Sequence, residues 1–175
     1  MTKLKRLNDW LMTPWYWLAV IVVGVVLIAV ALFYQHVLDE PPCVLCIHAR
    51  IWTLAGVLAA LVGIVVRRLW LGRVLAQVAV VISVAGLLER SYRTLQVERG
   101  TYEGLCGFDA GFPGWLPLDQ WFPNLFEVWT MCGYSPPFLF GMTMVEGLTY
   151  GTVVLLAVAI AALVVMVINR PNRHG

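Results

Sequence analysis

Four long apolar stretches, joined by segments that hold most of the charged residues, dominate this chain of 175 residues. They run from about 15 to 34, 44 to 66, 71 to 88 and 147 to 168. About 20 apolar residues in an α-helix cross the ~30 Å hydrocarbon core of a bilayer. Lipid offers no partner to an unpaired backbone N–H or C=O group, so each stretch should be a helix. We therefore expect an all-α membrane protein, a four-transmembrane-helix bundle that forms a single integral membrane domain over residues 1–175.

The basic residues predict how this bundle lies in the bilayer. Eight of the twelve flank one side of the expected helices: Lys3, Lys5, Arg6, Arg67, Arg68, Arg73, Arg170 and Arg173. Only one acid, Asp9, shares that side. Because Lys and Arg mark the cytoplasmic side, we expect a multi-pass protein with both termini in the cytoplasm. A cleaved signal peptide is the rival interpretation of the first stretch, but the stretch is long for one. The formal net charge of +2 gives no indication of a nucleic-acid partner.

Two segments should then lie outside, at about 35–43 and 90–146. The second is rich in glycine, proline and aromatic residues and should be a long irregular loop. Within it, residues 115–122 could form a short amphipathic helix in the headgroup layer, with Trp115, Leu118 and Phe122 on one face. The alternative is a loop that simply rests on the helix ends.

All four cysteines fall on this outer side, and Cys43 and Cys46 form a CxxC pair at the start of the second helix. Sequence proximity and the shared loop favour the pairings Cys43–Cys46 and Cys106–Cys132. A zinc site usually has two CxxC pairs, and this chain has one, so we expect no metal. Structural disulfides remain an alternative, although a CxxC bridge closes too short a loop to stabilise much. Redox exchange is favoured, since a CxxC pair is the usual unit of that chemistry.

Arg50 lies one helical turn beyond Cys46, and therefore on the same face of the second helix. There it could stabilise a Cys46 thiolate and donate hydrogen bonds to a carbonyl oxygen of an electron acceptor. An arginine in a membrane helix is costly and usually functional. The alternative is an interfacial anchor, because six residues past Val44 is only about 9 Å of helix. For His48, which points to another face, an interfacial polar role is the simpler interpretation.

Several blocks of the sequence, in this order, resemble the disulfide bond formation protein B (DsbB) family of the bacterial inner membrane. They are Phe33-Tyr34-Gln35-His36-Val37, Pro42-Cys43-Val44-Leu45-Cys46 with Arg50, Phe112-Pro113-Gly114-Trp115-Leu116-Pro117-Leu118-Asp119, and the positions of Cys106 and Cys132. The segment from Pro136 to Gly141 departs from the family pattern. The family's best-known members have a histidine after the third helix, where this chain offers Arg93, with Gln96 nearby. Arg93 and Gln96 are accordingly secondary candidates for the cofactor site.

The resemblance implies an enzyme, a protein-disulfide oxidoreductase and quinone reductase. Cys106–Cys132 would accept electrons from a DsbA-like periplasmic thioredoxin-fold oxidase, with Cys106 forming the mixed disulfide. Cys43–Cys46 would receive them and pass them to ubiquinone or menaquinone from the membrane pool, beside Arg50. No GxGxxG or CxxCH motif indicates a nucleotide cofactor or covalent haem. Two alternatives remain: a reductase similar to vitamin K epoxide reductase, or a non-catalytic membrane scaffold with structural disulfides.

Overall fold

The computed structural model describes residues 11, 13–101, 107, 109–133, 137 and 141–169. Four long helices account for most of these residues: α2 (Pro14–Val37), α3 (Val44–Val66), α4 (Trp70–Glu98) and α7 (Met144–Ile168). Two single-turn helices, α5 (Leu118–Trp121) and α6 (Pro123–Phe126), lie in the long loop between α4 and α7. No β-strand occurs in this part of the chain. The expected all-α, four-helix architecture is therefore confirmed.

The long helices correspond to the four apolar stretches, and α3 has the bounds expected from the sequence. The largest difference is at α4, which continues to Glu98 instead of ending near residue 88. Hydropathy marks where lipid contact ends, whereas a helix can continue into water when its side chains support it. Arg93 forms an ion pair with Glu89 one turn earlier, a spacing that stabilises exposed helix. The outer loop is correspondingly shorter than expected.

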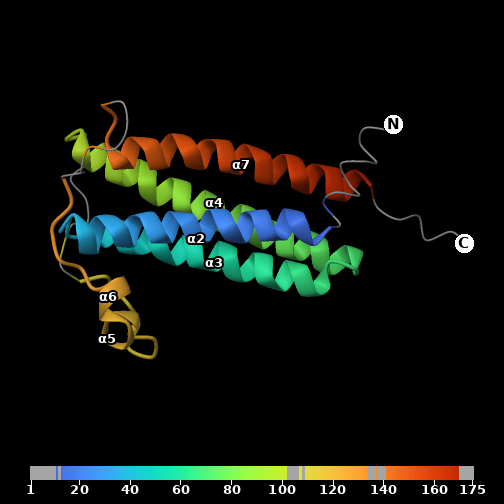
Figure 1. Ribbon diagram of the computed structural model, residues 1–175, viewed down its shortest axis with the longest axis horizontal. Helices are drawn as coiled ribbons and strands as arrows, with labels where there is room; N and C mark the ends of the chain where they lie inside the picture. Colours follow the sequence, from blue (N-terminus) through green and yellow to red (C-terminus); the bar gives the residue numbers. More distant parts are fainter. Residues whose placement is uncertain are drawn as a thin grey trace, which may run out of the picture.

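The four long helices form an elongated bundle in which α2 contacts α3, α3 contacts α4, and α4 contacts α7 (Figure 1). Contact between α2 and α7 is slight. Glycines permit the closest approaches: a Cβ atom at Gly63 would lie 2.3 Å from the ring of Trp17, and one at Gly86 would lie 2.4 Å from that of Trp52. Tight contacts on one side and a loose seam between α2 and α7 therefore characterise the bundle.

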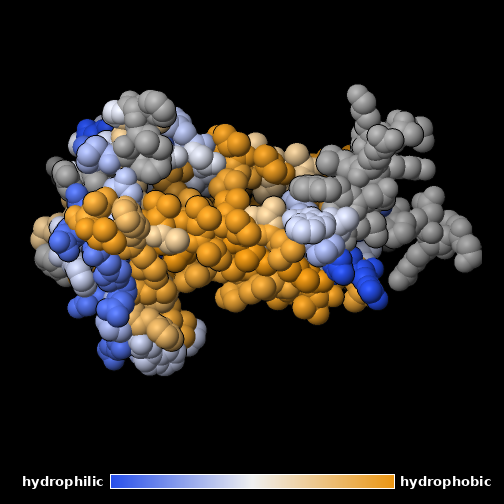
Figure 2. Space-filling model, viewed as in Figure 1, coloured by the Kyte–Doolittle hydropathy of each residue, from blue (hydrophilic) through white to orange (hydrophobic). Residues whose placement is uncertain are grey.

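The face of the bundle seen in Figure 2 is apolar along its length, with polar groups at its two ends. All four long helices are long and apolar enough to cross a membrane, and most residues of their apolar stretches are not buried inside the bundle. Inside the bundle, Gln77 accepts a hydrogen bond from the Tyr16 hydroxyl (2.9 Å) and donates one to the Ala159 carbonyl (2.9 Å). The chain is thus a multi-pass membrane protein.

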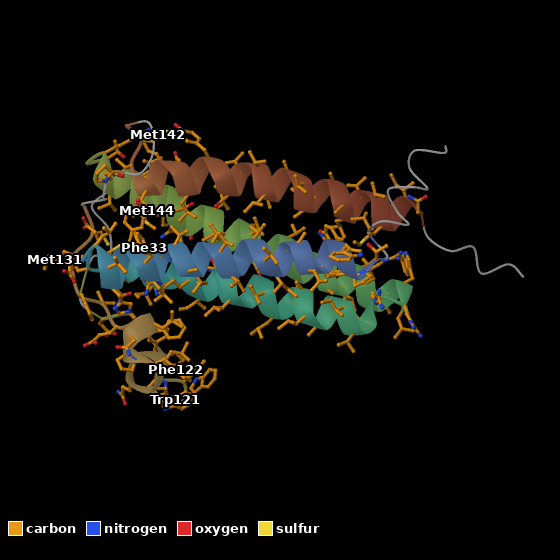
Figure 3. All side chains as sticks on the ribbon, in the orientation of Figure 1. Phe33, Trp121, Phe122, Met131, Met142 and Met144 are labelled. Atoms are coloured by element: carbon orange, nitrogen blue, oxygen red, sulfur yellow. The ribbon has the colours of Figure 1, made fainter. Side chains whose placement is uncertain are left out.

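The helices α5 and α6 sit beside one end of the bundle, where the loop carries Trp121 and Phe122 outward (Figures 1 and 3). A small cluster of Ile47, Ala110 and Phe126 attaches this part of the loop to α3. One short helix was expected at 115–122, but the structure has two separate turns. Phe122 has non-helical backbone angles (φ −135°, ψ 66°) because it precedes Pro123, and the residue before a proline avoids the helical region. Placement of these turns in the headgroup layer stays a prediction.

Candidate functional site

Cys43 and Cys46 lie where the chain enters α3, at the end of the bundle that carries the long loop. Cys43 is the N-cap residue, and its Sγ accepts a hydrogen bond from the backbone N–H of Cys46 (3.4 Å). The two sulfur atoms are 2.8 Å apart. Pro41 and Pro42 precede the pair and keep the chain extended up to the first helical turn. The local sequence thus places both sulfurs together at a helix N-terminus, as expected.

The long outer loop brings a third cysteine to the same place. Its residues Trp129 and Thr130 donate backbone hydrogen bonds to the carbonyl of Pro42 (3.0 and 3.4 Å), and Thr130 forms a parallel bridge with Cys43. Cys132 follows two residues later, and its side chain hydrogen-bonds with Cys43. Cys106, the other cysteine of the loop, lies outside the described residues. Of the four cysteines selected from the sequence, three therefore meet at one point.

The environment of Cys43 differs from that of Cys46. Hydrogen bonds with the side chains of Cys132 and Cys46, followed by burial, raise the pKa of the Cys43 thiol. Only 5% of Cys43 is exposed. Because the thiolate is the nucleophile in disulfide exchange, Cys43 is the member of the pair that keeps its proton. Cys46, one turn from Arg50, is the better placed to carry negative charge.

Arg50 is buried, and one end of its guanidinium is fixed by two hydrogen bonds. Its Nη1 donates to the Oε1 atom of Gln35 (2.7 Å) on α2 and to the backbone carbonyl of Leu125 (2.8 Å) on α6. Within the described part of the chain, neither Nη2 nor Nε has a hydrogen-bond acceptor, and neither atom is fully buried. These N–H groups can therefore donate to a ligand.

A cavity of about 220 Å³ lies between the outer ends of α2, α3, α4 and α7. Cys43, Cys46 and Arg50 line it on one side, and the hydroxyl residues Ser91 and Thr94 line it from α4. The rest of the lining is largely aliphatic, with residues such as Leu27 and Leu148. An apolar cavity of about 150 Å³ is enough to hold benzene, so this one has room for a substituted six-membered ring.

A second cavity of about 210 Å³ continues along the bundle from the first. The two share lining residues Leu27, Thr53 and Leu87. Both have walls on α2 and α7, the pair of helices with slight contact. The two cavities therefore adjoin inside the bundle, among all four long helices, and extend from the cysteine pair toward the middle of the bundle.

Sequence reasoning selected Arg50 but missed the groups that surround it. Gln35 was part of a family-like block and received no role, although an amide near the end of an apolar helix is a usable signal. Ser91 and Thr94 lay beyond the expected end of the third helix, so their shared face was not recognised. Neither Arg93 nor Gln96 lines the cavity. Arg93 instead forms an ion pair with Glu89. The contact of Arg93 and Gln96 with a cofactor therefore stays a prediction without support from the cavity lining.

A CxxC pair that borders a largely apolar cavity, inside a bundle of four helices able to cross a membrane, is the arrangement expected of a membrane thiol–disulfide oxidoreductase. The family model described as "Disulfide bond formation protein DsbB" matches residues 13–164. The chain therefore belongs to the DsbB family and is a protein-disulfide oxidoreductase active in disulfide bond formation.

Relatives of this family cover most of the chain. Disulfide bond formation protein B of Shewanella loihica is 33% identical over 153 residues, 87% of each chain. Disulfide bond formation protein B 2 of Pseudomonas aeruginosa is 32% identical over 131 residues, 74% of this chain and 78% of the relative. The Photorhabdus laumondii protein is 36% identical over 118 residues, 66% of this chain and 69% of the relative.

Proposed function

We propose that this protein reoxidises a DsbA-like periplasmic thioredoxin-fold oxidase and passes the electrons to membrane quinone, either ubiquinone or menaquinone. One observation carries the proposal: the CxxC pair and a buried arginine with free N–H groups line the same cavity. The cavity has walls on α2 and α7, which scarcely touch, and thus offers a route for a lipid-soluble molecule.

The residues present fit a quinone. The ring would occupy the cavity beside Cys46, and the N–H groups of Arg50 would donate to one of its carbonyl oxygens. The second cavity is almost entirely apolar and suits an isoprenoid tail. The quinone supplies the oxidising power by taking up two electrons and two protons. The protein's part is to hold the ring, to present Cys46 and to stabilise negative charge with Arg50.

The electrons would travel through two disulfide exchanges. In the first, the dithiol of the soluble oxidase is oxidised to a disulfide while Cys106–Cys132 is reduced to two thiols. In the second, those thiols are reoxidised while Cys43–Cys46 is reduced. The hydrogen bond between Cys132 and Cys43 supports this route, because exchange requires a sulfur to attack a neighbouring sulfur. The Cys43–Cys46 dithiol then closes again as the quinone is reduced to quinol.

Thermodynamics also favours a quinone. The reduction potential of DsbA is about −120 mV, and each 30 mV is worth about 1.4 kcal/mol for a two-electron couple. The terminal acceptor must therefore be a strong oxidant. A lipid quinone meets this requirement and reaches the site through the bilayer.

The same proposal includes the orientation in the inner membrane. Arg67 and Arg68 connect α3 to α4, and Arg73 lies in the first turn of α4, all at the bundle end opposite the cysteines. By the bias of basic residues toward the cytoplasm, the cysteine end faces the periplasm and both termini face the cytoplasm. The remaining basic residues of this argument, at positions 3, 5, 6, 170 and 173, lie outside the described part of the chain.

The decisive experiment mixes purified protein in nanodiscs with reduced thioredoxin-fold oxidase and a short-chain ubiquinone or menaquinone, and follows quinol formation by absorbance. We expect turnover with the wild type and none with Cys46→Ser. A matched control is Val65→Cys in the Cys46→Ser background, which restores the number of thiols at the opposite end of α3 without creating a new CxxC pair. Thiol exchange without quinol formation would contradict the proposal and indicate the reductase alternative. Absence of any thiol exchange would favour a scaffold.

A further inference from the structure

Gln35 stands behind Arg50 and outside the cavity. Only 2% of Gln35 is exposed, and both ends of its amide are paired. Its Oε1 accepts from Nη1 of Arg50 (2.7 Å), and its Nε2 donates to the backbone carbonyl of Asn124 (3.3 Å). A buried amide in an apolar helix is stable only when its hydrogen bonds are made. Gln35 therefore ties α2 to Arg50 and to the outer loop at once.

The two hydrogen bonds of Nη1 determine how the guanidinium is turned. Nη1 has two N–H groups, and Gln35 and the carbonyl of Leu125 accept one each. A guanidinium is planar and rigid. Fixing Nη1 at two points therefore also fixes the directions of Nη2 and Nε, the atoms left for a ligand. Arg50 would otherwise have several rotamers, and some of them would turn these groups away from the cavity.

We propose that Gln35 is a positioning residue that, with the α6 backbone carbonyls of Asn124 and Leu125, orients Arg50 and so couples the outer loop to the quinone site. This inference rests on the proposed quinone reaction. The three groups act on the ligand only through Arg50, since Gln35 and α6 do not line the cavity.

The coupling follows from chain connectivity. The loop that contains α6 continues through Trp129 and Thr130, which pair with Pro42, to Cys132. The loop is therefore held at two places, one beside the CxxC pair and one on Arg50. A displacement of the loop that opens Cys132 to a partner also removes an acceptor from Arg50. Since coupling between two sites is reciprocal, a bound quinone should hold the α6 turn in place.

The test uses Gln35→Met, which keeps the shape of the side chain and removes both hydrogen bonds. Loss of a hydrogen bond to a charged group leads us to expect a rise of roughly ten-fold in KM for quinone. The kcat at saturating quinone, and the quinone-independent exchange between the loop cysteines and the soluble oxidase, should stay within about two-fold of the wild type. Gln35→Glu keeps an acceptor for Arg50, and KM should largely recover.

A double-mutant cycle separates positioning from general destabilisation. In an Arg50→Ala background, Gln35→Met should cause no further rise in KM, because its effect passes through Arg50. Gln120→Leu, at an exposed glutamine of the same loop, is the matched control and should leave KM unchanged. Hydrogen exchange at the amides of residues 125–127 should slow when quinone binds to the wild type, and should slow less in Gln35→Met.

The outcomes are distinguishable from failure of the proposed function. A wild type that forms no quinol would overturn the quinone reaction and this inference with it. A wild type that forms quinol, with KM unchanged in Gln35→Met, would overturn this inference alone. So would an equal rise in KM with and without Arg50. If Gln35→Met does not fold, Gln35→Glu still decides the point, since a ten-fold rise in its KM would contradict the role assigned to the acceptor.

Discussion

Replacement of Arg50 by alanine should weaken quinone use while leaving the thiol chemistry at the loop intact. Two observations on Arg50 matter here: its Nη1 is fixed by Gln35 and Leu125, and the residue lines the cavity. One hydrogen bond from a charged group is worth about 1.5–3 kcal/mol. At about 1.4 kcal/mol for each factor of ten, its loss raises KM for quinone by about ten- to a hundred-fold.

The assay is steady-state quinol formation at varied concentrations of a short-chain quinone, with the reduced oxidase in excess. Arg50→Lys is the informative companion, because lysine retains the charge but not the planar fork of donors. We expect an intermediate KM for it. A parallel single-turnover experiment without added quinone measures exchange between the soluble oxidase and the loop cysteines, which should be unaffected. If Arg50→Ala had wild-type quinone kinetics, the arginine would be an interfacial anchor, and the proposed site would be wrong.

Three further changes test the fold and the dithiol. Because the pKa of Cys43 is raised, the folded, reduced protein retains a proton that the unfolded chain loses above about pH 8.5. The stability of the reduced protein should therefore fall as pH rises beyond that value. The melting temperature of Cys43→Ala should depend less on pH, and an equal dependence would contradict the assignment. Thr143→Ala removes the capping box of α7 and should cost about 1 kcal/mol in unfolding free energy, with Thr143→Ser, which keeps a capping hydroxyl, as the control. Tyr16→Phe should lower the free energy of unfolding, measured by thermal unfolding, by only about 0.6 kcal/mol, because hydrogen bonds between membrane helices are weak on average. A much larger loss of stability would contradict this and show that the Tyr16–Gln77 hydrogen bond holds the bundle together.

Much of the fold could be predicted from the sequence because lipid imposes a simple rule. A long apolar stretch must be helical in a bilayer, and the four stretches became α2, α3, α4 and α7. The end of α4 could not be found in this way, since its last turns carry Glu89 and Arg93 and no longer follow hydropathy. The break between α5 and α6 at Phe122 was readable from Pro123, and the expected single helix overlooked it.

The candidate site was predictable only as far as local spacing extends. Cys43, Cys46 and Arg50 share two adjacent turns of one helix, so their proximity follows from the sequence. The approach of Cys132 depends on backbone hydrogen bonds between residues 129–130 and Pro42, which connect segments far apart in the chain. No local sequence pattern predicts such a contact. For the same reason the partnership of Gln35 with Arg50, across two helices, could not be derived.

The geometry of the cavity also explains why the proposed reaction uses two pairs of cysteines. Cys43 and Cys46 line the cavity, whereas Cys132 contacts Cys43 and does not line it. The sulfur of Cys132 can therefore reach Cys43 but not a ligand in the cavity. In the proposed reaction, electrons from a soluble dithiol therefore pass through the loop to the CxxC pair before they reach the lipid phase, and Cys43 is where the two halves of that path meet.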